Sequence, residues 1–530
     1  MKIGKFEIFL LLLFLIFSWW LMFKSFSYDT KKSQFLIAKN QVGDFGLHLS
    51  LIRSISWGNN VPVELPFYPG RSLPYHYYTD FAAGLLERLG LRIDLAFNGI
   101  SIVFFTLLLY LMYKIPQLIF GKNKFLGITS VLLFLFNSSL TFIHFFQQNH
   151  LSAHSLSAIW HLSDYVDKAP FDNSVISIFF TMNTYLNQRH LIAGLAISLS
   201  LFALLYPKII KNKKIEASHL VLLGAILGIS SRVHSLIFLT TFIFFALLFL
   251  NFRKIKELFY FLIPAGLFFL PHLKDILMGT SHKLFTPGFL VSNHLSLGSF
   301  VNFWFLNLGL AFFATPISFF VLKKNQKKLF LSVVCIFVLG NLFQFSYRID
   351  HNHSLFNFVF IFSNFFTAYL LSLFWKKSYI WKMGTVVLLF FLTFSGIIDL
   401  MVVKNDYHLP YNVAPKNKLM SFIKSTPPNS IFLAKGDLMD PVTLSGRKNY
   451  FGAVYYMQVL GYDYAKRQKL AEKIFAMENV GELKLAKAQH ISYLIVSKNT
   501  TDFPYNPNLD FLNSNTKKVY EDNSVSVFKL

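Results

Sequence analysis

Acidic, imidazole and phenol side chains gather in one proline-rich stretch of the sequence, residues 24–94. Asp44 and His48 stand four residues apart, and Asp80 follows a run of tyrosines. Carboxylates and imidazoles placed beside a reacting group can take and give protons, so these three residues form the candidate catalytic set. The candidate substrate-binding side chains of the same stretch are Glu64, Tyr75 and His76.

The spacing in this stretch predicts two helices. A helix from Phe45 to Trp57 would place Asp44 at its N-cap and would put His48 on the same face as Asp44. A second helix is expected from Thr79 to Leu89, with Asp80 in its first turn. Structural explanations stay open: Asp44 as a helix cap alone, His48 as a packed core histidine, and the tyrosines as an interfacial belt.

A second set of candidates lies at the ends of apolar stretches. An arginine at such a boundary can bind a phosphate, because its guanidinium offers a planar fork of donors. The structural alternative is that the arginine only extends its charged head toward water. The candidate substrate-binding residues of this set are Arg189, His190, Arg232, His234, Arg348 and Asp350.

The elements that must position these residues are apolar and long. Of the 530 residues, 54% are hydrophobic, 64 are Phe, and only 14% are charged, well below the roughly 25% of a soluble domain. A helix needs about 20 apolar residues to span a membrane. Eleven candidate spans follow: 7–23, 95–113, 125–143, 190–207, 217–231, 235–252, 258–271, 300–322, 329–346, 354–374 and 380–402.

The net charge of +24 follows the predicted topology of the chain. With the N-terminus inside, the short cytoplasmic segments hold 19 Lys and Arg against three acids. This distribution is the positive-inside pattern of membrane proteins. It argues against the interpretation that the basic residues bind nucleic acid. We therefore expect a multi-pass plasma-membrane protein with a cytoplasmic N-terminus. The lone cysteine, Cys335, forms no internal disulfide, so the redox compartment stays open.

Hydropathy divides the chain into two expected domains. Residues 1–402 would form a helical transmembrane bundle, with long exoplasmic loops at 24–94 and 144–189. Residues 403–530 would form a small soluble exoplasmic α/β domain, with helices at 417–424, 463–477 and 482–488, strands at 430–434 and 491–497, and a last strand pair near 517–528. The fold class is thus an α-helical polytopic bundle of about 11 transmembrane helices with a C-terminal α/β domain.

Several short motifs resemble a known superfamily of membrane proteins. The order of a first span, a long outer loop with an early Asp, many spans and an outer domain is similar to the GT-C membrane glycosyltransferases. More narrowly, the chain resembles bacterial multi-spanning members of that kind in its GDxxxH, YHY and NQRH motifs. These are Gly43–His48, Tyr75–Tyr77 and Asn187–His190, with Asp350 and the run Ser395–Asp399 as further matches.

The resemblance implies a sugar donor carried on a polyprenyl phosphate and an exoplasmic acceptor, which is a glycan, lipid or protein of the cell envelope. A carboxylate of the first outer loop would activate the acceptor hydroxyl, and Asp44 matches that role by position. Asp80 or Glu64 would support Asp44, and Arg189, Arg232 or Arg348 would neutralise the leaving phosphate. The sequence departs from the superfamily pattern because Phe45 and Gly46 stand where an acidic partner is usual.

Two other function classes remain open, a transporter or flippase of envelope lipid or sugar and a non-catalytic envelope assembly protein. No cofactor is certain, although a divalent metal such as Mg²⁺ or Mn²⁺ stays open. The sequence leaves the sugar, the acceptor, the stereochemistry and the oligomeric state undetermined. The glycosyltransferase hypothesis predicts that the acids and arginines named above converge on one lipid-borne phosphate.

Overall fold

The computed structural model describes residues 4–167, 174–277, 282–412, 416–498, 502–504 and 506–530. The chain divides into two compact units. The helical unit comprises Met1–Ser25, Ser101–Pro271 and His282–Tyr407. The mixed unit comprises Phe26–Ile100, His272–Ser281 and His408–Leu530. The long loop and the C-terminal segment, which the sequence analysis treated as separate parts, thus belong to one unit.

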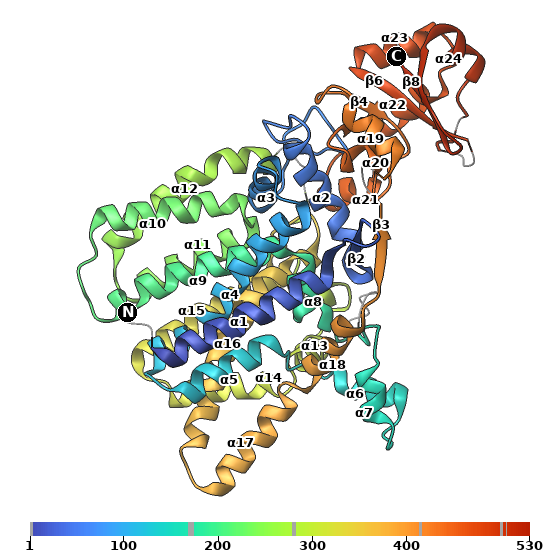
Figure 1. Ribbon diagram of the computed structural model, residues 1–530. Helices are drawn as coiled ribbons and strands as arrows, with labels where there is room; N and C mark the ends of the chain where they lie inside the picture. The colour runs from blue at the N-terminus through green and yellow to red at the C-terminus, as the bar shows by residue number, and fades with distance from the viewer. Residues whose placement is uncertain (1–3, 168–173, 278–281, 413–415, 499–501, 505) are drawn as a thin grey trace. The chain divides into compact units, whose positions relative to one another are not determined.

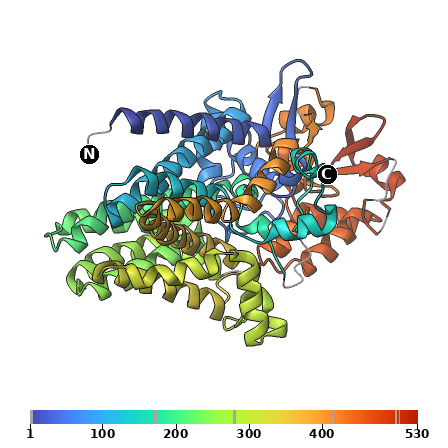
Figure 2. The same ribbon diagram turned by 90° about the horizontal axis from the view of Figure 1, so that it is seen from below.

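Among the described residues, five helices are long and apolar enough to cross a membrane, or up to seven spans if each of two bent helix pairs counts as one. A membrane-spanning helix satisfies its backbone hydrogen bonds internally, as a lipid environment requires. In Figure 2, α1 (Lys5–Ser25), the dark-blue helix that starts near the N-terminus, lies at the edge of the helical unit. Its side chains Ile8, Phe9 and Trp19 are exposed. The five are α1 (Lys5–Ser25), α4 (Ile93–Phe120), α9 (Arg189–Ile210), α12 (Ile255–Leu277) and α16 (His353–Trp375).

Other apolar stretches form shorter or bent helices. The two bent pairs are α13 (Leu297–Leu308) with α14 (Ala311–Val321), bent by 88°, and α17 (Tyr379–Phe391) with α18 (Phe394–Asn405), bent by 42°. The remaining helices of this unit are α5 (Lys124–Leu135), α6 (Thr141–Asn149), α7 (Ser155–Trp160), α8 (Met182–Asn187), α10 (Ala217–Ile229), α11 (Ser235–Asn251) and α15 (Lys324–Leu342).

The chain is a helical membrane protein, but the expected count of eleven spans is not confirmed. The stretch predicted at 125–143 stops being one helix at Leu135, and the stretch at 300–322 breaks at Gly309. The stretch at 258–271, expected to be short, belongs to the 23 residues of α12. Hydropathy averages over about 20 residues, so it does not detect breaks inside an apolar run.

The break between α13 and α14 has a clear local cause. Gly309 has a φ of 50°, a left-handed conformation that glycine adopts without strain. A Cβ at this position would lie 2.0 Å from the carbonyl oxygen of Ser138. The Ser138 hydroxyl donates a hydrogen bond of 2.7 Å to the carbonyl of Leu308, which the end of α13 leaves without a helical donor.

The mixed unit contains two sheets. The first is antiparallel, in the order β1 (Phe26–Asp29), β2 (Gln34–Ala38), β3 (His408–Tyr411). The second has the order β5-β4-β6-β8-β7, in which β4 pairs in parallel with β5 and β6, and β8 pairs antiparallel with β6 and β7. Its strands are β4 (Ile431–Leu433), β5 (Lys448–Asn449), β6 (Ile491–Ser497), β7 (Lys517–Glu521) and β8 (Val525–Lys529).

Helices of the C-terminal segment accompany the second sheet. In Figure 1, α23 (Val480–Ala488) lies beside β6 near the C-terminus. The helices predicted from the sequence at 417–424, 463–477 and 482–488 are confirmed within two residues at each end. They are α19 (Lys418–Ser425), α22 (Ala465–Ala476) and α23. The short helices α20 (Pro441–Leu444) and α21 (Val454–Val459) lie between α19 and α22 in the sequence, and α24 (Leu509–Asn515) follows β6.

Two helices from the first loop, α2 (Val42–Ser56) and α3 (Tyr78–Arg88), form the other half of the mixed unit. They approach closely because Gly84 has no side chain: a Cβ there would lie 2.9 Å from the Cβ of Ile55. Phe45, Leu49 and Ile52 bury the apolar stripe of α2 that the sequence predicts. This helix pair positions the acids and the imidazole of the candidate site.

Candidate functional site

His48 and Asp80 form a buried pair between α2 and α3. Nδ1 of His48 lies 2.9 Å from Oδ2 of Asp80, and the two side chains are 3% and 1% exposed. A carboxylate at one ring nitrogen fixes the tautomer and the orientation of an imidazole. A second tie, from Nη1 of Arg53 to Oε1 of Glu87 at 2.9 Å, holds the same two helices together. His48 is therefore held in one orientation on a rigid helix pair.

Asp44 lies one turn before His48, in the first turn of α2. The expectation that Asp44 caps the helix is wrong, because Gln41 is the N-cap and makes no side-chain cap hydrogen bond. The helix begins three residues earlier than expected, since Val42 and Gly43 join it. Asp44 is half-buried, and burial raises the pKa of its carboxyl, an effect that the nearby His48 partly offsets.

Tyr75 and His76 border the same acids. The ring centroids of Tyr75 and His48 are 6.4 Å apart, and those of Tyr75 and His76 are 3.8 Å apart. Burial, together with the charges of Asp44 and Asp80, raises the pKa of Tyr75 well above its ordinary value, so its hydroxyl stays protonated. The structure thus brings five predicted residues of the mixed unit into one group, which we call the α2–α3 acid site: Asp44, His48, Tyr75, His76 and Asp80.

Glu64 has a different environment from the α2–α3 acid site. Its Oε2 accepts hydrogen bonds from Nζ of Lys448, at 2.6 Å, and from the backbone N–H of Gly70, at 3.1 Å. These contacts tie the first loop to strand β5 and fix a turn at a glycine with a φ of 90°. A structural role accounts for Glu64 better than a contact with substrate.

Arg189 begins α9 in the helical unit and is 3% exposed. Its Nη2 donates to the hydroxyl of Ser25, at 2.7 Å, and to the carbonyl of Met22, at 3.3 Å, both at the end of α1. These two hydrogen bonds fix the position of the guanidinium at the end of α1.

His190 and His234 lie next to this arginine. Their ring centroids are 5.2 Å apart, and they are 2% and 4% exposed. His234 caps α11, because its Nδ1 accepts a hydrogen bond from the backbone N–H of Ile237. Arg232 ends the preceding 3-10 turn, Ser230–Arg232, and is half-buried. The four predicted residues thus come from two places more than 40 residues apart along the chain, and the rings of His190 and His234 bring the two places into contact.

Arg348 and Asp350 pair with each other. Nε and Nη2 of Arg348 donate to the two carboxylate oxygens of Asp350 at 3.0 and 2.7 Å. Such bidentate pairs satisfy both groups at once. The six predicted residues of the helical unit and the six of the mixed unit lie in separate compact units, and their convergence on one site stays a prediction.

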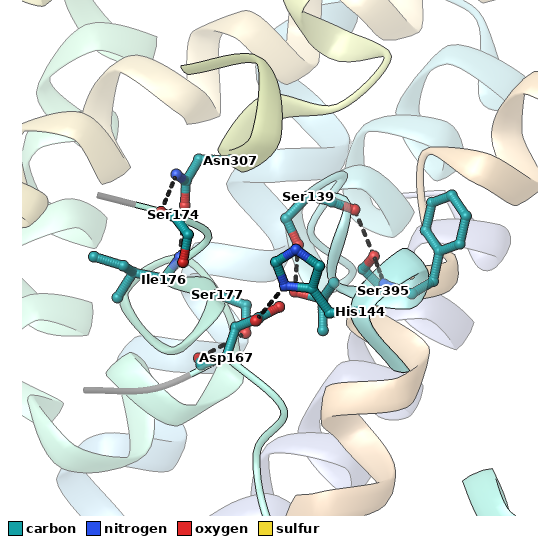
Figure 3. Close-up of polar contacts among 10 residues, drawn as sticks. Ser139, His144, Asp167, Ser174, Ile176, Ser177, Asn307 and Ser395 are labelled. Carbon is teal, nitrogen blue, oxygen red and sulfur yellow. Dashed lines mark hydrogen bonds and ion pairs between the residues drawn. The ribbon is translucent and has the colours of Figure 1, made fainter. Parts of the chain in front are cut away.

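One polar pair of the helical unit was not among the predicted site residues. Nδ1 of His144, on α6, lies 2.7 Å from Oδ1 of Asp167, and Ser177 donates from its hydroxyl to the carbonyl of Asp167 (Figure 3). Asn307 holds the neighbouring segment through the backbone of Ser174 and Ile176. His144 and Asp167 are 23 positions apart, a separation that matches neither helical nor strand spacing, so the sequence offers no signal for the pair.

Comparisons with solved structures found membrane glycosyltransferases. An oligosaccharyltransferase of Archaeoglobus fulgidus, tethered to an acceptor peptide, shares 12% identity over 93% of this chain and 69% of its own, with a TM-score of 0.47. The same enzyme in complex with Zn and sulfate shares 12% over 91% and 68%, with a TM-score of 0.45. ArnT of Cupriavidus metallidurans, bound to undecaprenyl phosphate, shares 8% over 98% and 97%, with a TM-score of 0.48.

These proteins are of the GT-C kind, the superfamily that the sequence motifs resemble. Identities of 8 to 12% and TM-scores below 0.5 assign neither an activity nor the role of any residue. No protein-family model and no curated protein matches the chain. The functional argument therefore depends on the chain's own residues.

Proposed function

We propose that the protein is a membrane glycosyltransferase that moves a sugar from a polyprenyl-phosphate donor to an acceptor outside the cytoplasm. The observation that supports this most is the α2–α3 acid site. Its half-buried Asp44 lies one helical turn from His48, which Asp80 holds in place. A carboxyl whose pKa is raised is a stronger base once ionised, which suits proton transfer from a hydroxyl.

In the proposed reaction, the acceptor hydroxyl gives its proton to Asp44 while its oxygen bonds to the anomeric carbon of the sugar. The bond from that carbon to the phosphate oxygen breaks, and the polyprenyl phosphate leaves with the electron pair. His48 lies one helical turn from Asp44 and partly offsets the rise that burial causes in the pKa of Asp44. Tyr75, kept protonated, donates a hydrogen bond to substrate or to Asp44.

The departing phosphate needs positive charge where it develops. Arg189, Arg232 and Arg348 are the candidates for this charge. The hydroxyl of Ser25 and the carbonyl of Met22 orient the guanidinium of Arg189. The rings of His190 and His234 lie side by side, and both histidines would form hydrogen bonds with the sugar phosphate.

The proposal also includes a divalent ion bound close to the phosphate. Oδ1 of Asp80 is buried without a hydrogen-bond partner among the described residues, and carboxylate oxygens are the ligands that Mg²⁺ and Mn²⁺ prefer. Asp80 would contribute a ligand to the ion, and the ion would neutralise phosphate charge. Mn²⁺ binding by the purified protein, followed by electron paramagnetic resonance, should weaken in Asp80→Asn; unchanged binding would exclude Asp80 as a ligand.

The orientation belongs to the same proposal. The lysine-rich short segments support a cytoplasmic N-terminus, and the mixed unit would then face the exoplasm, where a lipid-linked donor presents its sugar. The donor sugar, the acceptor and the stereochemistry stay open within the proposal.

The test is Asp44→Asn in the full chain, assayed for release of polyprenyl phosphate from a lipid-linked sugar. We expect a loss of about 100-fold or more, as for removal of a general base, with an unchanged midpoint of thermal unfolding. The matched control is Asp510→Asn, because Asp510 also lies in the first turn of a helix of the mixed unit but is exposed. Full activity in Asp44→Asn would remove Asp44 from the mechanism.

A further inference from the structure

The two short helices α6 and α7 of the helical unit form a hairpin, Thr141–Trp160, whose outer face carries exposed apolar side chains. In Figure 1 this α6–α7 hairpin projects at the lower right, beside α18. Leu151 and Leu156 are 81% and 80% exposed, and Trp160 is 55% exposed. Large apolar side chains that are this open and this close in sequence indicate a surface that binds an apolar partner.

The inner face of the hairpin is already packed against the helical unit. Phe145 of α6 and Ile159 of α7 are buried together with Ile398 of α18. Nδ2 of Asn405, the last residue of α18, donates to the carbonyl of Trp160 at 2.8 Å. The hairpin is therefore fixed to the end of a candidate span, and its exposed leucines lie on the side that the helical unit leaves open.

The base of the hairpin is continuous with the apolar surface of the bent pair α17 and α18, which can form one span. Phe142 of α6 lies against Phe391 of α17, with ring centroids 5.9 Å apart, and Phe146 stacks on Phe394 of α18 at 6.2 Å. The exposed side chains of α17 are apolar, among them Ile380. An apolar face on a membrane-spanning helix is covered by lipid, so lipid reaches the base of the hairpin.

The sequence of the hairpin lacks formal charges. No Asp, Glu, Lys or Arg occurs from Asn137 to Ser163, whereas about a quarter of the residues of a soluble domain are charged. Nζ of Lys404, from α18, lies 3.6 Å from the ring centroid of Trp160. Tryptophan beside the long side chain of a lysine is typical of the boundary between lipid and water.

The turn between α6 and α7 satisfies several of its own backbone groups. The backbone N–H of Ser152 donates to Oγ of Ser155 at 2.9 Å, and that of His154 donates to Oγ of Ser152 at 3.2 Å. The hydroxyl of Ser155 donates to the carbonyl of His150 at 3.4 Å. Backbone groups close to hydrocarbon need such partners, because lipid supplies none. The turn is therefore suited to contact with lipid.

We propose that the α6–α7 hairpin inserts its outer face into the bilayer, at the boundary between head groups and acyl chains. Leu151 and Leu156 contact the acyl chains, while Trp160 and Lys404 lie at the level of the head groups. Amphipathic helices at this boundary bury their apolar face to a depth of about 5–10 Å. The inference does not depend on the proposed glycosyl transfer, because it concerns lipid contact alone.

The test uses the full chain with Cys335→Ser, because Cys335 is the lone cysteine. In this background, Leu151→Cys and Leu156→Cys are spin-labelled separately and reconstituted into phosphatidylcholine bilayers. Electron paramagnetic resonance power saturation then compares collisions with oxygen, which enters lipid, and with a nickel chelate, which stays in water. We expect oxygen to dominate at both positions, with a depth of about 5–10 Å.

The matched control is Leu509→Cys in the same background, because Leu509 is an exposed leucine on a short helix of the mixed unit. Nickel should dominate at this position. Nickel collisions at positions 151 and 156 as frequent as at position 509 would overturn the proposal, because the hairpin would lie in water. Few collisions with either reagent would also overturn it, because protein, such as a second copy of the chain, would then cover the leucines. If one hairpin variant does not fold, the other gives the same measurement.

Discussion

At the scale of single residues, burial and neighbouring side chains separate the acids of the mixed unit into distinct roles. Glu64 and Glu87 pair with basic side chains, and Asp80 pairs with an imidazole. Asp44 instead lies at a helix start with its pKa raised by burial. A carboxyl in such a place is poised to exchange a proton rather than to hold a structural ion pair.

The charge of His48 gives a prediction for the pH dependence of transfer. His48 lowers the pKa of Asp44, so His48→Gln should raise that pKa further. Transfer needs Asp44 ionised, and activity is therefore lost as pH falls through this pKa. We expect the acid limb of the profile of kcat/KM against pH to move to higher pH in His48→Gln. An acid limb at the wild-type position would contradict the coupling.

Asp440 gives a prediction about stability rather than activity. It is fully buried at the N-cap of α20, where its oxygens accept from the backbone of Val442 and from Asn449. Burial raises the pKa of Asp440 to about 7. The folded chain thus keeps this proton while the unfolded chain releases it near pH 4, so stability falls as pH rises from about 4 to about 7 and then levels.

The difference of about three pH units corresponds to a loss on the order of 4 kcal/mol across that window. Asp440→Asn cannot ionise and should therefore lose less stability between pH 5 and pH 8 than the wild type. Thermal unfolding of the full chain by differential scanning fluorimetry measures both slopes. Parallel slopes in the two proteins would exclude Asp440 as the source.

At the scale of elements, the packing of α2 requires a glycine at position 46 but not at position 43. A Cβ at Gly46 would lie 1.9 Å from the carbonyl oxygen of Leu438 and 2.3 Å from the hydroxyl of Tyr456, whereas a Cβ at Gly43 would meet nothing within 4 Å. The hydroxyl of Tyr456 also donates to the carbonyl of Gly43, at 2.6 Å. Gly46, which stands where the superfamily usually has an acidic residue, is thus in close contact with the C-terminal segment.

We predict that Gly46→Ala lowers the free energy of unfolding by about 3 kcal/mol, because rigid backbone must move to admit the methyl group. Gly43→Ala lies in the same helix and should be neutral or slightly stabilising, since alanine favours the helix. Thermal unfolding of both variants, at the pH of the activity assay, checks the contrast. Equal unfolding temperatures for the two variants would refute the close packing around Gly46.

Elements with local signals were predictable from the sequence, and elements fixed by distant contacts were not. The helices α19, α22 and α23 and the strand β6 follow from hydrophobic spacing and caps such as Asn417 and Asn479. Strand β3 pairs with β2 although the two strands are more than 360 residues apart in the sequence, and no local pattern predicts this pairing. The break at Gly309 depends on Ser138, which is also remote in sequence.

The candidate site shows the same division. The helical spacing of Asp44 and His48 and the second helix containing Asp80 were visible in the sequence. The hydrogen bond between His48 and Asp80, the pairing of Glu64 with Lys448 and the pair His144–Asp167 were not. Each of these contacts joins elements whose register is set by packing, which a single sequence does not specify.

At the scale of the whole molecule, apolar helices and one unit rich in polar residues fit chemistry on a lipid-borne substrate. Within the part of the chain that the structure describes, five helices are suited to crossing a membrane, and each of two bent helix pairs could add one further span. The positive-inside pattern of the lysines assigns the mixed unit to the exoplasmic side in our proposal. An enzyme and a flippase could share such an architecture, so the distinction between them is chemical: an enzyme breaks the bond from sugar to phosphate, and a flippase keeps it.

The most direct measurement follows both products in liposomes that contain the purified chain and a polyprenyl-phosphate sugar labelled in the sugar. With a water-soluble acceptor supplied at the exoplasmic face, our account predicts labelled acceptor and free polyprenyl phosphate in equal amounts. Translocation of intact lipid-linked sugar without release of polyprenyl phosphate would contradict it.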